Sequence, residues 1–140
     1  MNYEEYEMQC RQQQEKNNSY LEIFERDLME SGFTHKTISK HVSNVDFYIN
    51  DYLQRESPFG MQEGCGSKID MFLGYFFIHR CMWSTPGTIK TTAASIKKFY
   101  KCMNEHGYVS KEKYNYLCTI IKEKMEKWQD DCAAFNNFHE

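Results

Sequence analysis

The amino-acid sequence predicts an all-α fold, in which four helices form an orthogonal pair of hairpins and a long amphipathic helix follows. Apolar residues after position 18 recur with a spacing near 3.6, and no segment keeps the alternating pattern of a strand. Serine, threonine and proline stand where helices would begin, and glycine stands where they would end. The 140 residues are 41% hydrophobic and 16% aromatic, which is enough apolar material for one core.

The first predicted helix covers residues 19–31. Ser19 and Glu22 have the spacing of a capping box, in which each side chain binds the other residue's backbone N–H. Gly32 suits the left-handed turn that commonly ends a helix. The preceding segment, 1–18, is polar and acidic, and we expect it to be an N-terminal extension.

The second predicted helix begins after Thr34, whose hydroxyl can accept a hydrogen bond from a backbone N–H of the first turn. Its apolar residues form one face: Ile38, Val42, Val45, Ile49, Tyr52 and Leu53. Ser57 and Pro58 end it, because the residue before a proline disfavours the helical conformation. Residues 57–66 are predicted to be a loop.

The third and fourth predicted helices have different start signals. Ser67 followed by Asp70 resembles a capping box and precedes an apolar stretch, so we expect a third helix that is buried on most sides. Thr85 followed by Pro86 is a cap with proline at the first helical position, and it predicts a fourth helix over 86–106.

Ser110 is expected to begin a last helix within a C-terminal segment, 110–140, that follows a domain of residues 19–109. Its apolar residues alternate spacings of three and four over three heptads: Tyr114, Cys118, Ile121, Met125, Trp128, Cys132 and Phe135. Three heptads are borderline for a coiled coil, so the pattern favours packing on the same domain. Packing on a partner is the alternative.

The second and fourth predicted helices resemble each other at an offset of 51 residues. Thr-His-Lys-Thr-Ile at 34–38 aligns with Thr-Pro-Gly-Thr-Ile at 85–89, and the apolar positions that follow also correspond. Gly-Phe at 32–33 and Gly-Tyr at 107–108 each end a helix with glycine and an aromatic residue. This internal similarity implies two helical hairpins.

The net charge of −3 conceals a basic segment. Residues 1–31 carry −5, residues 32–83 are neutral, residues 84–127 carry nine lysines and four acids (+5), and residues 128–140 carry −3. This distribution excludes a protein coated uniformly in positive charge, but it is compatible with one basic face.

Lysine and hydroxyl side chains lie outside the apolar stripes of the second and fourth helices. Near a helix N-terminus such residues suit phosphate groups, because free N–H groups and the helix dipole favour an anion there. Two such starts side by side would bind one phosphate backbone; the alternative is that the hydroxyls are caps and the lysines only keep the surface soluble. The residues are Lys36, Ser39, Lys40 and Ser43 on the second helix, and Lys90, Thr91, Ser95, Lys97, Lys98 and Lys101 on the fourth.

The order of these motifs resembles the N-terminal core-binding domain of tyrosine recombinases and phage integrases, the SAM-like integrase domain. The resemblance is carried by residues 28–53 and 69–109. It implies two helical hairpins that form half of a clamp around double-stranded DNA, with the second and fourth helices facing the duplex. The residues it places at the DNA, mainly at the phosphate backbone, are Lys36, Ser39, Lys40, Ser43, Thr88, Lys90, Thr91, Ser95 and Lys98.

The sequence departs from that family after Tyr108. In the family a second domain supplies an arginine-rich active site and a tyrosine nucleophile, and the residues left here are too few to contain it. We therefore expect a stand-alone DNA-binding domain, accessory to or a remnant of DNA recombination or integration, with no catalysis by itself and no cofactor. The helix at 110–135, which stands in place of a linker, is suited to contact a recombinase or a second copy. The alternative function is a helical dimerisation module that has lost DNA binding.

The six cysteines contain no CxxC pair, and we expect reduced thiols in a cytoplasmic protein. Cys102 with His106, and His79 with Cys81, suggest a zinc site, but neither pair has zinc-finger spacing. Small buried side chains are the favoured interpretation, and no metal is expected. The longest apolar segment, 69–83, contains charged residues and is too short to span a membrane, so we expect no membrane partner.

Overall fold

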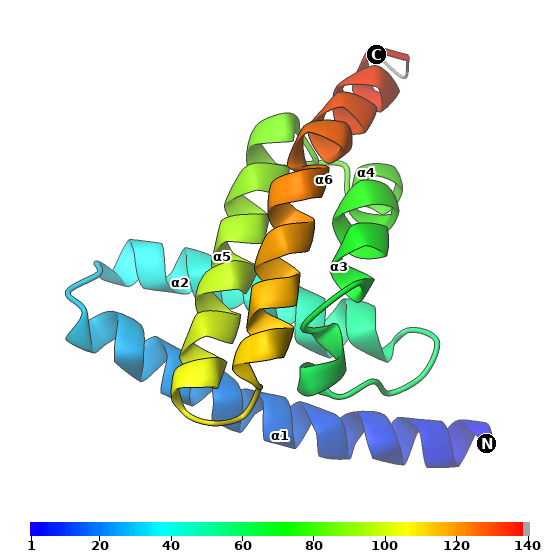
Figure 1. Cartoon of the computed structure of the whole chain (residues 1–140). Coiled ribbons are helices and arrows are strands. Elements are labelled where there is room, and N and C mark those ends of the chain that lie inside the picture. The colour runs from blue at the N-terminus through cyan, green and yellow to red at the C-terminus, as the bar shows by residue number, and fades with distance from the viewer. Residues whose placement is uncertain (139–140) are drawn as a thin grey trace.

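The computed structural model describes residues 1–138, and the all-α prediction is confirmed, since those residues form helices, turns and loops without a strand (Figure 1). Two of the helices contain π or 3₁₀ segments, which are labelled η. The elements are α1 (Tyr3–Glu30), α2 (His35–Asp46), η1 (Phe47–Asp51), η2 (Tyr52–Gln54), η3 (Met61–Gly64), α3 (Lys68–Met71), η4 (Phe72–Phe76), α4 (Phe77–Arg80), α5 (Pro86–Glu105) and α6 (Lys111–Phe138).

The first helix is longer than predicted, because residues 3–18 belong to α1 and do not form a separate extension. Asn2 caps it, accepting a hydrogen bond from the backbone N–H of Glu5 at 2.8 Å. The predicted cap at Ser19 is wrong: the Ser19 hydroxyl donates to the carbonyl oxygen of Glu15 in mid-helix, at 3.4 Å.

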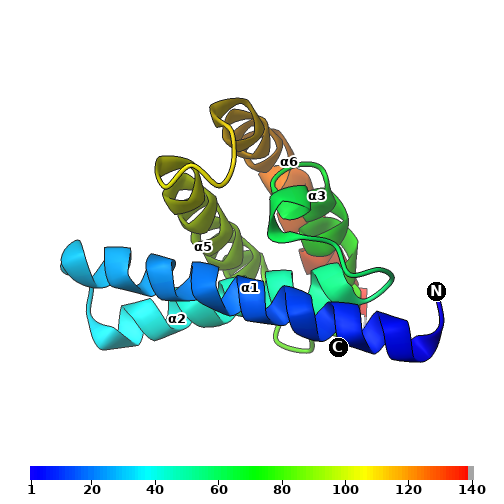
Figure 2. The same cartoon turned by 90° about the horizontal axis from the view of Figure 1, so that it is seen from below.

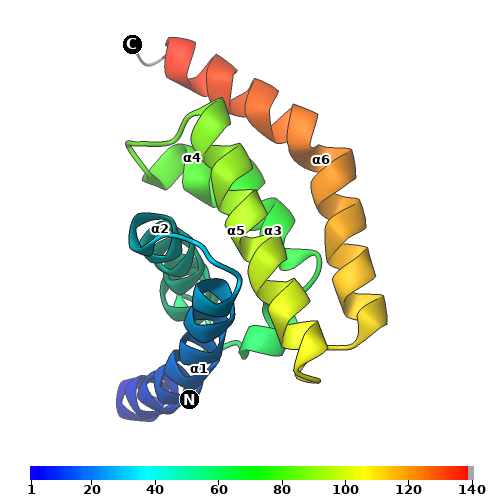
Figure 3. The same cartoon turned by 90° about the vertical axis from the view of Figure 1, so that its left-hand side faces the viewer.

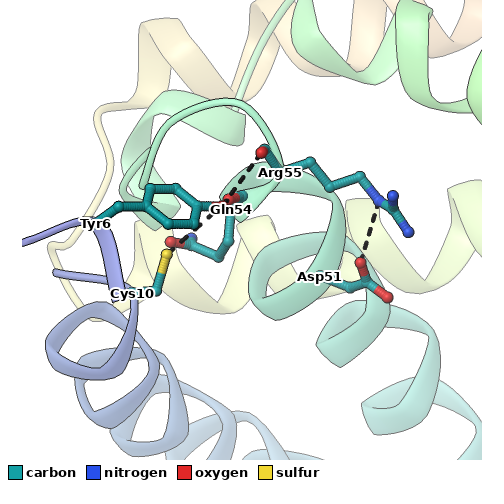
Figure 4. Close-up of polar contacts among 5 residues, drawn as sticks. All are labelled: Tyr6, Cys10, Asp51, Gln54 and Arg55. Atoms are coloured by element: carbon teal, nitrogen blue, oxygen red, sulfur yellow. Dashed lines mark hydrogen bonds and ion pairs between the residues drawn. The ribbon is translucent and has the colours of Figure 1, made fainter. Parts of the chain in front are cut away.

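The N-terminal half of α1 packs against the end of the second helix (Figure 4). The Tyr6 hydroxyl donates to the backbone carbonyl of Gln54, and the Cys10 thiol lies 4.0 Å from the same oxygen. Farther along α1, Asn17 is fully buried and donates to the carbonyl oxygen of Ile49 at 3.1 Å. These tertiary contacts explain why a segment with so few apolar residues is helical.

The second helix begins as predicted and ends irregularly. Thr34 caps α2, accepting from the Thr37 N–H at 3.3 Å. The helix then continues through the π segment η1 and the 3₁₀ segment η2. At this irregular end the Gln54 amide also donates to the Ile49 carbonyl oxygen, at 3.0 Å.

The third helix is continuous from α3 through η4 to α4, but the predicted cap does not form. Ser67 makes no capping hydrogen bond. Asp70, its expected partner in the box, instead accepts a hydrogen bond from the indole N–H of Trp128 at 2.7 Å. The capping box does not form because the Asp70 carboxylate binds Trp128 of α6, which is 58 residues away in the sequence.

The start of α5 and the two glycine turns agree with the sequence. Thr85 and Thr88 form a reciprocal capping box, and Pro86 occupies the first turn. Gly32 and Gly107 have φ angles of 88° and 84°, which favour glycine. The aromatic residue after each glycine donates its N–H to the carbonyl oxygen five residues back, at 3.2 and 2.8 Å.

The last helix packs on its own chain. Figure 3 shows α6 curving along α5, with α2 on the opposite side of α5. The heptad residues Tyr114, Cys118, Ile121, Met125, Trp128, Cys132 and Phe135 are all buried or half-buried. Gln129 donates to the carbonyl oxygen of Pro86 and Asn136 to that of Ser84, both at 2.9 Å, so the end of α6 is attached to the start of α5.

Two helix pairs enclose the core. Helices α1 and α2 lie side by side at one end of the molecule, as Figure 2 shows, while α6 packs against α5 and against the helix at 68–80. No described helix combines the length and the apolar character that crossing a membrane requires.

Candidate nucleic-acid interface

The surface where α2 meets α5 is strongly basic. Residues 33–45 contain two lysines, residues 85–104 contain four, and neither segment contains a carboxylate. Five of the six side chains are exposed and Lys98 is half-buried. Within residues 1–138 none of the six forms an ion pair. We call these residues the basic face: Lys36, Lys40, Lys90, Lys97, Lys98 and Lys101.

Helix α2 crosses α5 and does not run alongside it, as Figures 1 and 3 show. Phe33, just before α2, lies beside Lys98 in the second half of α5, with the ammonium nitrogen 5.0 Å from the ring centroid. Phe47, just after α2, lies beside Trp83, which precedes α5, with ring centroids 6.1 Å apart. The first turn of α2 therefore lies beside the middle of α5 and not beside its start, so the expectation of two helix starts side by side was wrong.

A pocket of about 260 Å³ lies between α2 and α5. It brings together two lysines of α2 and the hydroxyl residues of the first half of α5, which are far apart in the sequence. Its lining residues are Lys36, Thr37, Lys40, His41, Asn44, Thr91, Ala94 and Ser95.

Ser95 is buried in this contact and is not a surface residue, contrary to expectation. Its side chain is 1% exposed. The hydroxyl donates to the carbonyl oxygen of Thr91 at 3.1 Å and accepts from the Asn44 amide at 3.0 Å, and His41 Nδ1 lies 2.8 Å away. Because α5 is covered by α2 as well as by α6, its buried face is wider than the apolar stripe indicates. Ser95 holds α2 against α5.

The two predicted threonines of α5 use their hydroxyl groups for the helix itself. The Thr88 hydroxyl accepts from the N–H of Thr85 at 2.8 Å and lies 3.1 Å from its carbonyl oxygen. The Thr91 hydroxyl donates to the carbonyl oxygen of Thr88 at 3.1 Å. Both protons are directed at backbone acceptors, so the lysines, and not the threonines, are the donors that this face offers to a ligand.

On α2 the predicted residues divide between two sides. Lys36 and Lys40 line the pocket against α5. Ser39 and Ser43 are exposed, and Ser43 lines a different groove, beside the carboxylate of Asp46. Only the lysine side of α2 joins the basic face.

Lys97 and Lys101 belong to the same exposed stripe of α5, although the family resemblance did not place them at DNA. They lie one turn apart and follow Lys90 at helical spacing. Two features identify Lys97 and Lys101 as part of the basic face. The first 19 residues of α5 contain no carboxylate, and the opposite side of α5 is buried.

His41 adds no permanent charge to the basic face. Burial and the nearby positive charge of Lys98 both lower the pKa of His41 from its usual value of 6.5. The imidazole is therefore neutral at pH 7, and the positive potential comes from the lysines.

Comparisons with protein-family models, curated proteins and solved structures found no match to this chain. The candidate function therefore depends on the geometry and charge of the basic face, together with the motif resemblance.

Proposed function

We propose that this chain is a DNA-binding domain similar to the core-binding domain of tyrosine recombinases, and that it contacts the phosphates of a duplex through the basic face. The observation that carries the proposal is the set of six lysines on α2 and α5, none of which forms an ion pair within residues 1–138, together with the absence of carboxylates from segments 33–45 and 85–104. Acids lie at one edge of the face, where Lys98 and Lys101 line a pocket with Asp27 and Glu105. In a recombination system the domain would be an accessory factor or a remnant of a recombinase. We propose that these 140 residues bind DNA and do not themselves catalyse strand exchange.

The dimensions of the basic face suit a short tract of DNA. Lys90 and Lys101 are eleven residues apart on α5, which corresponds to about 16 Å along the helix axis. A duplex rises 3.4 Å per base pair, so this stripe faces about five base pairs. Lysines that contact phosphates carry little sequence information, and we expect weak sequence preference.

The burial of the α6 stripe favours this proposal over the dimerisation module. An interface through the heptad residues requires an exposed apolar seam, whereas Trp128 and Cys132 are almost fully buried by the rest of the chain. We expect a monomer in light scattering at micromolar concentration.

The proposal is tested by reversing two charges of the basic face. Lys90→Glu with Lys98→Glu places two carboxylates where phosphates would bind, and we expect loss of gel-shift binding to a generic duplex at low salt. The matched control is Lys122→Glu with Lys124→Glu, which makes the same charge change at exposed positions of α6. The control should retain most of the affinity, because its lysines lie outside the basic face.

Circular dichroism and thermal melting of both variants separate loss of binding from loss of fold. Exposed substitutions change stability by no more than about 0.5 kcal/mol, whereas Lys98 is half-buried beside the ring of Phe33 and its replacement can cost more. Equal loss of binding in both variants would mean that net charge and not the basic face determines affinity. No binding by the wild-type protein at low salt, together with a stable dimer, would favour the dimerisation module.

A further inference from the structure

Three side chains with metal-binding chemistry converge at the opposite end of α5 from its capping box. The Cys102 thiol donates to Asp27 Oδ2 at 3.0 Å, and His106 Nε2 lies 2.8 Å from the same carboxylate oxygen. The three potential ligand atoms all lie within 4.8 Å of one another. They come from two helices, since Asp27 is on α1 whereas the other two residues are at the end of α5.

The local structure fixes this arrangement. Cys102 and His106 are four residues apart and project from the same side of the helix end. Cys102 is 6% exposed, whereas His106 and Asp27 are accessible from solvent, so an ion can enter. Among the described residues Asp27 makes no ion pair with a lysine or arginine.

We infer that Asp27, Cys102 and His106 form a binding site for Zn²⁺. Thiolate, imidazole and carboxylate are the three ligand types that zinc takes in proteins, and the sulfur ligand selects against Mg²⁺ and Ca²⁺. With zinc–ligand bonds of 2.0–2.3 Å, neighbouring ligand atoms of a tetrahedral site are about 3.3–3.6 Å apart. The present contacts to Asp27 Oδ2 are shorter than this by less than 1 Å, and no two of the three ligand atoms are more than 4.8 Å apart, so binding requires a local adjustment of these side chains.

Binding of Zn²⁺ requires that the Cys102 thiol lose its proton. Burial and the Asp27 carboxylate both raise the pKa of the Cys102 thiol, so the metal-free protein holds a proton on sulfur. When the sulfur binds zinc, that proton is released to solvent, and His106 carries its ring proton on Nδ1. A water molecule would complete the tetrahedron, and Asp27 and Cys102 line a pocket of about 140 Å³ that can hold solvent.

The two cysteine–histidine pairs of the sequence are not brought together. His79 stacks on Tyr75, with ring centroids 4.2 Å apart, and also lies against Phe135. Cys81 is buried elsewhere, near Asp51 and Arg55. The third ligand of the inferred site is instead a carboxylate 75 residues before Cys102, which no local spacing reveals.

Titration of the chelator-treated full chain with Co²⁺ tests the site. We expect one equivalent to bind and to produce a thiolate-to-cobalt charge-transfer absorption, which Zn²⁺ then removes. His106→Gln should weaken binding at least tenfold, and Cys102→Ser should abolish the absorption. His106 is exposed, so its replacement leaves the fold intact, as circular dichroism will show. The matched controls are His79→Gln, also exposed, and Cys118→Ser, half-buried on α6; both should bind as the wild type does.

Zinc at a hundredfold excess over its dissociation constant should also raise the melting temperature by about 10 °C. The same excess of Mg²⁺ should not, because it lacks affinity for thiolate. The inference is overturned if the wild-type protein gives no charge-transfer absorption, or if Cys102→Ser or His106→Gln retains wild-type affinity.

Discussion

At the scale of single residues, the packing of Trp128 depends on the absence of a side chain at Gly74. Trp128 is 1% exposed, and its indole N–H is bound by Asp70. A Cβ added to Gly74 would lie 2.8 Å from Cδ1 and 2.9 Å from Nε1 of the indole, which is closer than real contacts allow. The indole therefore lies directly against the backbone of η4, and α6 approaches the third helix closely at this point.

Gly74→Ala should therefore destabilise the protein by about 1–3 kcal/mol, because the buried indole cannot move away without strain. Gly87→Ala is the control in another helix. Its added Cβ would lie 3.7 Å from the nearest atom, the Thr85 hydroxyl oxygen, and we expect a gain of about 0.5–1 kcal/mol from better helix propensity. Urea denaturation measures both changes. Equal stability of the two variants would contradict the packing of Trp128 against Gly74.

The sequence does not predict the roles of residues that contact a helix far away in the chain. Ser95 stands at a position that an apolar stripe would leave in solvent, yet α2 covers it. Asp27 is an ordinary acid of an acidic helix until the fold places it beside Cys102 and His106. Local spacing determines which residues share a helix face, but it contains no information on which faces meet.

At the scale of elements, helix ends were predictable where the cap is local. Thr34 and Thr85 each bind an N–H three residues later, and Gly32 and Gly107 adopt the left-handed turn. The helix starts that were predicted wrongly are those at which a tertiary contact replaces the expected local cap. Ser19 stands inside α1, since the polar residues before it bind the end of the second helix and extend α1 to Tyr3.

Asn17 is the fully buried polar residue that connects this part of α1 to the second helix. It is fully buried and its amide donates to the Ile49 carbonyl oxygen and to the Asn50 side chain, at 3.1 and 2.8 Å. Asn17→Ala should destabilise the protein by about 1–3 kcal/mol, because the buried Ile49 carbonyl loses one of its two side-chain donors and the half-buried Asn50 side chain loses its hydrogen bond from Asn17. Asn18→Ala, at the adjacent exposed position, should change stability by less than about 0.5 kcal/mol.

Urea denaturation again separates the two asparagine variants. If the two substitutions lower the free energy of unfolding equally, then the contact of Asn17 with the second helix does not contribute to stability. In that case the N-terminal half of α1 stabilises the protein only through its helical propensity.

At the scale of the whole molecule, charge is separated between surfaces. The chain is acidic overall, with a net charge of −3, and residues 1–31 alone carry −5. The basic face lies on α2 and α5, where the segments 33–45 and 85–104 contain no acid. A duplex would therefore be attracted to this face and repelled by the acidic residues of α1. Contact from one side predicts modest affinity with a strong dependence on salt.

The salt dependence counts the phosphates that the basic face neutralises. Each phosphate contact contributes about −0.9 to the slope of log K against log salt concentration, so six lysines give at most a slope of about −5. Lys36→Ala with Lys40→Ala removes the contribution of α2 and should reduce the magnitude of the slope by about 2, while the lysines of α5 retain weaker binding. Fluorescence anisotropy on one duplex across a range of salt concentrations measures both slopes. A variant that binds more weakly with an unchanged slope would mean that α2 positions α5 and does not itself contact phosphate.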